Sequence, residues 1–199
     1  DLEKILNSIR QRKTHSNIMR SGIGVGGYCL TKDPLFAKAS SKQILKKKFD
    51  FPISSRAVEI NKKMTPDIML EIKKKFSKRL LRKKVLLIGV SYREDTNDTR
   101  YAPAEKVFNF LKKVGCKLSF YDPIVNHWSH TNTYSVEKKY LKDFEVYVYL
   151  TKHQLFKNLK IAYKNKSLIL DLNHVLDKKK RLEISKNKKY ESYFIGSKE

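Results

Sequence analysis

The sequence has little of what would place a protein outside a reducing compartment or across a membrane. It has two cysteines among 199 residues, and no apolar run approaches the about 20 residues that a spanning helix needs. Cys29 and Cys116 stand in unrelated contexts and cannot form a disulfide framework, so we expect a cytoplasmic protein with no membrane partner. The five histidines do not pair at helical spacing or flank a cysteine pair, so we expect no metal site.

Acidic residues are also scarce. The chain has 20 Asp and Glu against 44 Lys and Arg, a formal net charge of +24, which raises nucleic acid as a partner. Only nine of the basic residues are arginine, the type that clamps phosphates and reads bases with a bidentate fork. We therefore predict no specific nucleic-acid partner and favour phosphate-bearing small ligands. A basic nucleic-acid binder is kept as a third hypothesis, which predicts steeply salt-dependent binding to any duplex.

The apolar pattern divides the chain near residue 80. Residues 1–80 place apolar side chains at helical spacing, with a helix restarting at Thr65-Pro66 and one glycine-rich interruption. Residues 83–199 alternate strands and helices, which is typical of a parallel sheet with right-handed crossovers. We predict an α/β fold in which a helical central segment is followed by a Rossmann-like parallel-sheet domain. The basic run Lys178–Arg181 is expected to be a solvated loop. The expected strands are 85–90, 117–121, 145–150, 168–172 and 192–195, with a helix over 103–114.

Four of the seven glycines lie between Gly22 and Gly27. The spacing Gly22-x-Gly24-x-x-Gly27 matches the dinucleotide fingerprint by letter, but that fingerprint needs a strand before it and a helix after it, and the preceding residues are polar. The glycines let the backbone approach a ligand closely. Cys29 follows beside a helix start at Asp33, where cations and the helix dipole can make a thiol nucleophilic. An isolated cysteine is more simply a small buried side chain.

The segment Gly-Val-Gly-Gly-Tyr-Cys-Leu-Thr-Lys-Asp-Pro, at residues 24–34, resembles the active-site loop of the UDP-glucose/GDP-mannose dehydrogenase family, the NAD-dependent nucleotide-sugar 6-dehydrogenases. The resemblance implies that Cys29 attacks the sugar aldehyde to give a thiohemiacetal. NAD oxidises this to a thioester, which water hydrolyses to the uronic acid. By the same resemblance Asp33 orders that water and Lys32 lies on the cofactor side. The substrate-binding residues that it implies around this loop are Arg20, Gly22, Ile23, Gly24 and Tyr28.

A second segment, Gly-Val-Ser-Tyr-Arg-Glu-Asp-Thr-Asn-Asp-Thr-Arg at residues 89–100, is similar to the first strand and loop of the family's UDP-binding domain, and Tyr121-Asp122-Pro123 matches a later strand end. A loop after the first strand of a parallel sheet lies at the carboxyl edge, where ligands bind. The resemblance implies that Tyr92 and Arg93 contact the substrate and that Arg100 faces the cofactor. The charged residues that end this segment could equally form a self-satisfied turn.

The resemblance also assigns parts to the chain. Residues 1–80 would be the dimerisation and active-site segment and 83–199 the UDP-binding domain, with the NAD domain, which holds the main NAD site, on chain preceding residue 1. We therefore expect a homo-oligomer that binds a UDP-sugar, either UDP-glucose or a UDP-N-acetylhexosamine, and no NAD reduction by the isolated chain. Arg93 stands where the family has lysine, and Asn173 where it commonly has arginine. The alternative is a degenerate, non-catalytic UDP-binding or scaffolding fragment with no use for Cys29.

Overall fold

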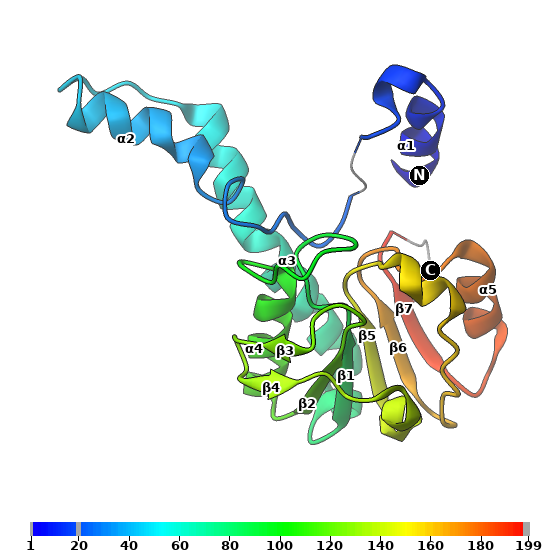
Figure 1. Cartoon of the computed structure of the whole chain (residues 1–199). Helices are drawn as coiled ribbons and strands as arrows, with labels where there is room; N and C mark the ends of the chain where they lie inside the picture. Colours follow the sequence, from blue (N-terminus) through cyan, green and yellow to red (C-terminus); the bar gives the residue numbers. More distant parts are fainter. Residues whose placement is uncertain (1, 19–20, 197–199) are drawn as a thin grey trace.

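A computed structural model of the chain describes residues 2–18 and 21–196. Its centre is a five-stranded parallel sheet in the order β2-β1-β5-β6-β7 (Figure 1). The order reverses at β1, which has β2 on one side and β5 on the other, and open α/β sheets bind ligands at such a point. The predicted α/β class is confirmed. The strands are β1 (Lys84–Ile88), β2 (Lys117–Tyr121), β5 (Val146–Tyr149), β6 (Leu168–Asp171) and β7 (Glu191–Phe194).

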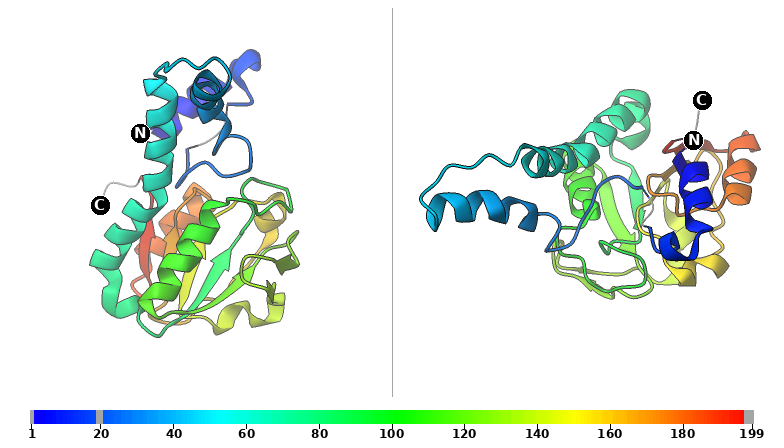
Figure 2. Two further views of the ribbon diagram at one scale, coloured as in Figure 1. Left: turned by 90° about the vertical axis from the view of Figure 1, so that its left-hand side faces the viewer. Right: turned by 90° about the horizontal axis from the view of Figure 1, so that it is seen from above.

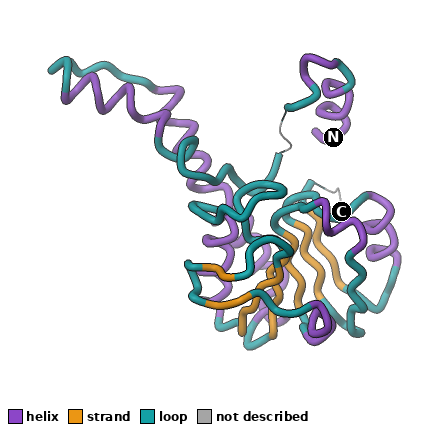
Figure 3. The backbone as a smooth tube through the Cα atoms, viewed as in Figure 1, coloured by secondary structure: helices purple, strands orange, loops and turns teal. Residues whose placement is uncertain are grey.

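Helices cover both faces of the sheet. From Val85 to Ile88, β1 is fully buried and alternates its side chains, with Val85 and Leu87 in one core and Leu86 and Ile88 in the other, as a strand buried on both faces must. The first core lies under α3 (Pro52–Leu80) and α4 (Pro103–Val114), and the second under η3 (Lys138–Asp143), η4 (Gln154–Asn158) and α5 (Lys178–Lys186). The strands and their helical covers are separated by colour in Figure 3.

The helix α3 runs through Pro66 without the predicted restart and is kinked further on, at Phe76, where φ is −124° and ψ is 24°. Proline removes the N–H that would bond the Lys62 carbonyl one turn back. The Lys106 ammonium of α4 lies 3.4 Å from that carbonyl and supplies a donor in its place. The second half of α3 packs Met69, Ile72, Phe76 and Leu80 onto the sheet. The division of the chain near residues 80–83 stays a prediction.

The basic run Lys178–Arg181 is helical, so its prediction as a loop was wrong. Asp177 caps α5 by accepting a hydrogen bond from the backbone N–H of Lys180 at 2.7 Å. The Arg181 guanidinium bonds the buried Asp171 carboxylate at the end of β6 at 2.8 Å. A cap and one buried ion pair thus fix a helix whose sequence carries almost no apolar periodicity.

The remaining elements are not part of the five-stranded sheet. The helix α2 (Phe36–Gln43) and the first half of α3 project together from the body of the molecule, and both views in Figure 2 show this arm. A short hairpin joins β3 (His127–Trp128) to β4 (Thr133–Tyr134). No helix in the described part of the chain is both long and apolar enough to span a bilayer. The other short elements are α1 (Leu2–Arg10), η1 (Lys13–His15) and η2 (Asp33–Leu35).

Candidate functional site

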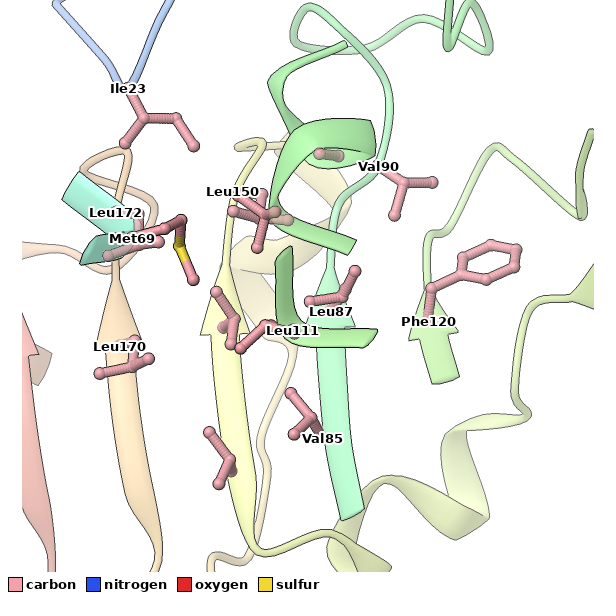
Figure 4. Close-up of a cluster of buried hydrophobic side chains, with 14 of the residues drawn as sticks. Ile23, Met69, Val85, Leu87, Val90, Leu111, Phe120, Leu150, Leu170 and Leu172 are labelled. Carbon is pink, nitrogen blue, oxygen red and sulfur yellow. The ribbon is translucent and has the colours of Figure 1, made fainter. Parts of the chain in front are cut away.

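The glycine stretch, residues 22–27, forms a backbone cradle seated on α3. Ile23 is buried above Met69 and Leu172 at the end of the core (Figure 4), and its carbonyl accepts a hydrogen bond from Thr65 Oγ1 at 2.8 Å. Asn61 bonds both backbone groups of Val25, two residues further on: its Oδ1 accepts from the Val25 N–H at 2.7 Å, and its Nδ2 donates to the Val25 carbonyl at 2.8 Å. One helix turn therefore fixes the cradle through three hydrogen bonds.

The cradle also packs directly on the loop that follows β1. The Gly27 N–H donates to the Arg100 carbonyl at 3.1 Å. A Cβ at Gly26 would lie 2.9 Å from Pro103 Cδ, and one at Gly27, whose φ is +85°, would lie 2.9 Å from the Tyr92 ring. Only glycine allows this approach and this backbone. The two segments that the sequence singled out separately thus meet at the carboxyl edge of the sheet.

Cys29 is exposed at the end of the cradle and is not the buried side chain of the alternative interpretation. Its carbonyl accepts from the Lys32 and Asp33 N–H groups at 3.1 and 2.9 Å, which closes a turn. Lys32 Nζ bonds Asp33 Oδ1 at 2.6 Å and lies 4.3 Å from the centre of the Tyr28 ring. Arg100 approaches the other part of that ring, at 5.6 Å.

Two cations therefore lie over the ring of Tyr28, the residue before Cys29. The hydrogen bond with Asp33 raises the pKa of Lys32, and the nearby Cys29 adds a smaller contribution. The hydrogen bond with Asp98 raises the pKa of Arg100, again with a smaller contribution from Cys29. Both side chains stay charged at neutral pH, as a nucleophilic thiolate requires of its neighbours.

Arg100 is bound within its own loop. Its Nε and Nη2 bond the Asp98 carboxylate at 3.0 and 2.7 Å, and the Arg100 hydrogen bond lowers the pKa of Asp98. This is the self-satisfied turn that the sequence left open. The guanidinium is nonetheless exposed and lies beside Tyr28, so the turn places Arg100 next to the cradle.

Tyr92 and Arg93 follow β1 directly. The Tyr92 N–H donates to the Asp98 carbonyl at 2.9 Å, and its ring packs under Gly27. Arg93 is exposed and makes no ion pair with any other described residue, so its guanidinium can meet a phosphate. A cation at this edge of the sheet suits a pyrophosphate.

A buried polar pair under this loop escaped the sequence analysis. Asp122, at the end of β2, and His153, after β5, have no exposed side-chain surface, and Asp122 Oδ2 lies 3.2 Å from His153 Nε2. Burial acts to raise the pKa of Asp122, but the hydrogen bonds from His153 and from the Val125 and Ile124 N–H groups outweigh it, so the pKa lies below its ordinary value. The spacing of the histidines along the chain, on which the sequence analysis relied, does not predict the pair.

Asn173 lies between the start of the cradle and the end of β5. Its Nδ2 donates to the Leu150 carbonyl at 2.7 Å, and a Cβ on Gly22 would collide with its Oδ1. Asn173 thus places an amide where the family commonly has an arginine. Arg20, the other predicted substrate residue here, lies outside the described residues.

No cluster of three His, Cys, Asp or Glu side chains within residues 2–18 and 21–196 could hold a metal ion. A cavity of about 590 Å³ lies between α3, α5 and β7, and it shares no lining residue with the cradle or with the loop after β1. The candidate site is therefore an open edge of the sheet, bordered by the cradle, Tyr28 and Arg93.

Comparison with known proteins agrees with this geometry. Residues 86–178 match the UDP-binding domain of the UDP-glucose/GDP-mannose dehydrogenase family. A UDP-N-acetyl-D-mannosamine dehydrogenase of Methanococcus vannielii is 32% identical over 192 residues, which cover 88% of this chain and 42% of that protein. The same enzyme of Methanococcus aeolicus is 29% identical over 82% of this chain and 34% of its own length. The chain thus spans less than half of these relatives.

Solved structures agree in fold. An NDP-N-acetyl-D-galactosaminuronic acid dehydrogenase from Methanosarcina mazei Go1 superposes with a TM-score of 0.77 at 22% identity, over all of this chain and 44% of the other. A UDP-D-ManNAc dehydrogenase from Pyrococcus horikoshii gives 0.63 at 25% identity, over 86% and 41%. Residues 86–178 of the chain thus form a UDP-binding domain of the UDP-glucose/GDP-mannose dehydrogenase family.

Proposed function

We propose that this chain supplies the UDP-sugar site and the catalytic cysteine of an NAD-dependent nucleotide-sugar 6-dehydrogenase. The substrate would be UDP-glucose or a UDP-N-acetylhexosamine. One observation carries the proposal: the cradle that ends in the exposed Cys29 packs against the loop that presents Tyr92 and Arg93. A nucleotide on the sheet edge would then place its sugar toward the thiol.

Cys29 would act as the nucleophile. The C6 alcohol would first be oxidised to the aldehyde, with its hydride passing to NAD and its proton to solvent. The Cys29 thiolate then adds to the aldehyde carbon to form a thiohemiacetal, transfer of a second hydride to NAD would give a thioester, and water releases the uronic acid and returns the thiol. Asp33 Oδ1 is occupied by Lys32 at 2.6 Å, which leaves Oδ2 to orient the water. The cradle would hold the sugar through the backbone of Gly22, Ile23 and Gly24.

NAD supplies the hydride acceptor when it is bound. Lys32 and Arg100 would lie on the cofactor side of Cys29, where their positive charges suit the diphosphate of the dinucleotide. The described residues do not form the rest of an NAD site. A dinucleotide fold has a strand before its glycine pattern and a helix after it. Here residue 21, before the cradle, is loop, and a turn and η2 follow the cradle. We therefore expect no NAD reduction by the chain alone.

A homo-oligomer would form through the projecting arm. Large apolar side chains are exposed along α2, the loop after it and the first half of α3, and such patches mark protein interfaces. Ile53, with 86% of its surface exposed, is the most accessible of them. The others are Phe36, Ile44, Leu45, Phe49 and Ile60.

Calorimetric titration of the chain with UDP tests the nucleotide half of the proposal. We expect binding that weakens about tenfold in Arg93→Ala, because a charge-assisted hydrogen bond contributes about 1.5 kcal/mol. Lys164→Ala, on an exposed lysine ahead of β6, is the matched control and should leave the affinity unchanged. Absence of any UDP binding would contradict the proposal.

A further inference from the structure

His153 and Asp122 are the two fully buried ionisable side chains closest to the proposed nucleotide loop, and the proposed chemistry uses neither. They come from different strands, since Asp122 ends β2 and His153 follows β5. The loop after β1 bonds to both of them, through the Val90 N–H to Asp122 and through the Asp95 N–H to His153. A buried charge is retained only where hydrogen bonds satisfy it, so the partners of the pair indicate its role.

Asp122 is saturated with donors. Its Oδ1 accepts from the Ile124 and Val125 N–H groups, both at 2.9 Å. Its Oδ2 accepts from the Val90 N–H at 2.8 Å and lies 3.2 Å from His153 Nε2. An ionised carboxylate accepts four such bonds without needing a proton of its own.

The partners of His153 select one tautomer. Its Nδ1 lies 3.0 Å from the Asp95 backbone nitrogen, which can only donate, so Nδ1 is the acceptor. The ring proton therefore sits on Nε2 and points to Asp122 Oδ2. The ring also lies edge-on to Phe156, with centroids 5.2 Å apart, which fixes its plane. Protein groups thus occupy both nitrogens, and His153 cannot bond a ligand.

These contacts hold the loop after β1 at both ends. Val90 is bound to Asp122, the Ser91 carbonyl accepts from Thr151 Oγ1 at 2.6 Å, and Asp95 is bound to His153. Tyr92 and Arg93 are the residues between these fixed points. Their side chains project from a backbone that has little freedom to move.

We propose that His153 is a positioning residue that sets nucleotide affinity by holding the backbone on which Tyr92 and Arg93 stand. It acts through the Asp95 N–H on one side and Asp122 on the other, and it does not touch the ligand. The inference rests on the proposed UDP binding at this loop. It adds to that proposal the residue, His153, that holds the loop in the conformation that binds UDP.

Two substitutions and one control test the role of His153. His153→Phe keeps an aromatic ring and removes the hydrogen bonds with Asp95, Asp122 and Ser91. His153→Asn keeps an oxygen within reach of the Asp95 N–H. Tyr147→Phe is the control, because it also removes one buried hydrogen bond, from the Tyr147 hydroxyl to the Phe144 carbonyl. Each variant is titrated with UDP, and amide hydrogen exchange of Val90 and Asp95 is measured without ligand.

We expect His153→Phe to weaken UDP binding at least tenfold and to speed exchange at Asp95. His153→Asn should recover a measurable part of both, and Tyr147→Phe should change neither. If His153→Phe binds UDP within twofold of the wild type, or exchanges its Asp95 amide no faster, the positioning role is wrong. If the wild type binds no UDP, the proposed function fails, and the exchange data alone then decide whether the loop is held as described. If His153→Phe does not fold, the same comparison is made on His153→Asn against Tyr147→Phe.

Discussion

The two halves of the candidate site are held in different ways. The nucleotide half, the loop after β1, is fixed by side chains with no exposed surface, chiefly Asp122 and His153. The sugar half, the cradle, is fixed by one buried hydrogen bond from Thr65 to Ile23 and by two exposed ones between Asn61 and Val25, and both side chains stand on α3. Buried hydrogen bonds are costly to break because water cannot replace the lost partner, whereas partly exposed ones are cheap. The nucleotide half is thus part of the core of the sheet, and the sugar half depends on one helix.

This difference separates stability from sugar binding. A substitution in the buried pair should lower the stability of the whole domain. A substitution in Asn61 should leave the domain folded and change the geometry around Cys29. The projecting arm begins on the same helix that carries Asn61, so assembly and the sugar half share one element.

The largest effect is expected for Asp122→Asn. The amide can no longer accept all four hydrogen bonds, so buried donors lose their partner and the free energy of unfolding should fall by about 3 kcal/mol. Urea denaturation measures the change. Asp143→Asn, whose carboxylate is exposed and 3.9 Å from Lys164, should stay within about 0.5 kcal/mol of the wild type. Equal losses in the two variants would contradict the buried network.

The same pair predicts a dependence on pH. The pKa of Asp122 is lower in the folded chain than its ordinary 3.8, so the folded state binds this proton less well than the unfolded state does. The stability that the ionised carboxylate contributes is therefore complete above pH 3.8 and is lost as the pH falls through the folded pKa. The difference in the free energy of unfolding between wild type and Asp122→Asn should be large at pH 6 and smaller at pH 3. A difference in urea denaturation that does not change with pH would refute this assignment.

A smaller loss of stability, about 1 kcal/mol, is expected for Asn61→Asp. The carboxylate cannot donate to the Val25 carbonyl and instead repels it, so the cradle should loosen while the loop after β1 stays in place. UDP affinity should remain within twofold of the wild type, and protection of Cys29 by UDP-glucose should weaken. Asn165→Asp, an exposed residue ahead of β6, makes the same charge change away from the site. Parallel losses of UDP and UDP-glucose binding in Asn61→Asp would remove the distinction between the halves.

The smallest effect on folding is expected for Ile53→Asp on the arm. The side chain is exposed, so the free energy of unfolding should change by less than about 0.5 kcal/mol. Light scattering after size exclusion should nonetheless show weaker self-association. Leu155→Asp, which also replaces an exposed apolar side chain but on η4, should leave the mass unchanged. A monomeric wild type at high concentration would exclude the arm as an interface.

The sequence predicted the elements that carry strong local signals. The helix over 103–114 begins at a proline and ends at Gly115 in the left-handed region, and β1 is a continuous apolar run. The continuity of α3 and the helix α5 could not be predicted in this way. One depends on a lysine donor from α4 and the other on the Arg181–Asp171 pair, and neither contact leaves a local pattern.

The candidate site divides in the same manner. The glycine stretch and the loop after β1 were found from residue types at fixed spacing. Asn61 and His153 were not, because Asn61 meets Val25 across 36 positions and His153 meets Asp95 across 58. Side-chain-to-backbone bonds over such distances depend on the fold and not on any spacing in the sequence.

Competitive alkylation of the two cysteines tests the central claim, that Cys29 stands where the sugar of a UDP-sugar binds, most directly. Cys116 is the internal reference, because burial raises the pKa of its thiol to about 11 and its Sγ bonds the Leu80 carbonyl. We predict that iodoacetamide labels Cys29 much faster than Cys116 and that UDP-glucose or a UDP-N-acetylhexosamine slows only the Cys29 reaction. Labelling of Cys29 at a rate that neither nucleotide sugar changes, in a chain that still binds UDP, would contradict the claim and identify a UDP-binding fragment without a catalytic cysteine.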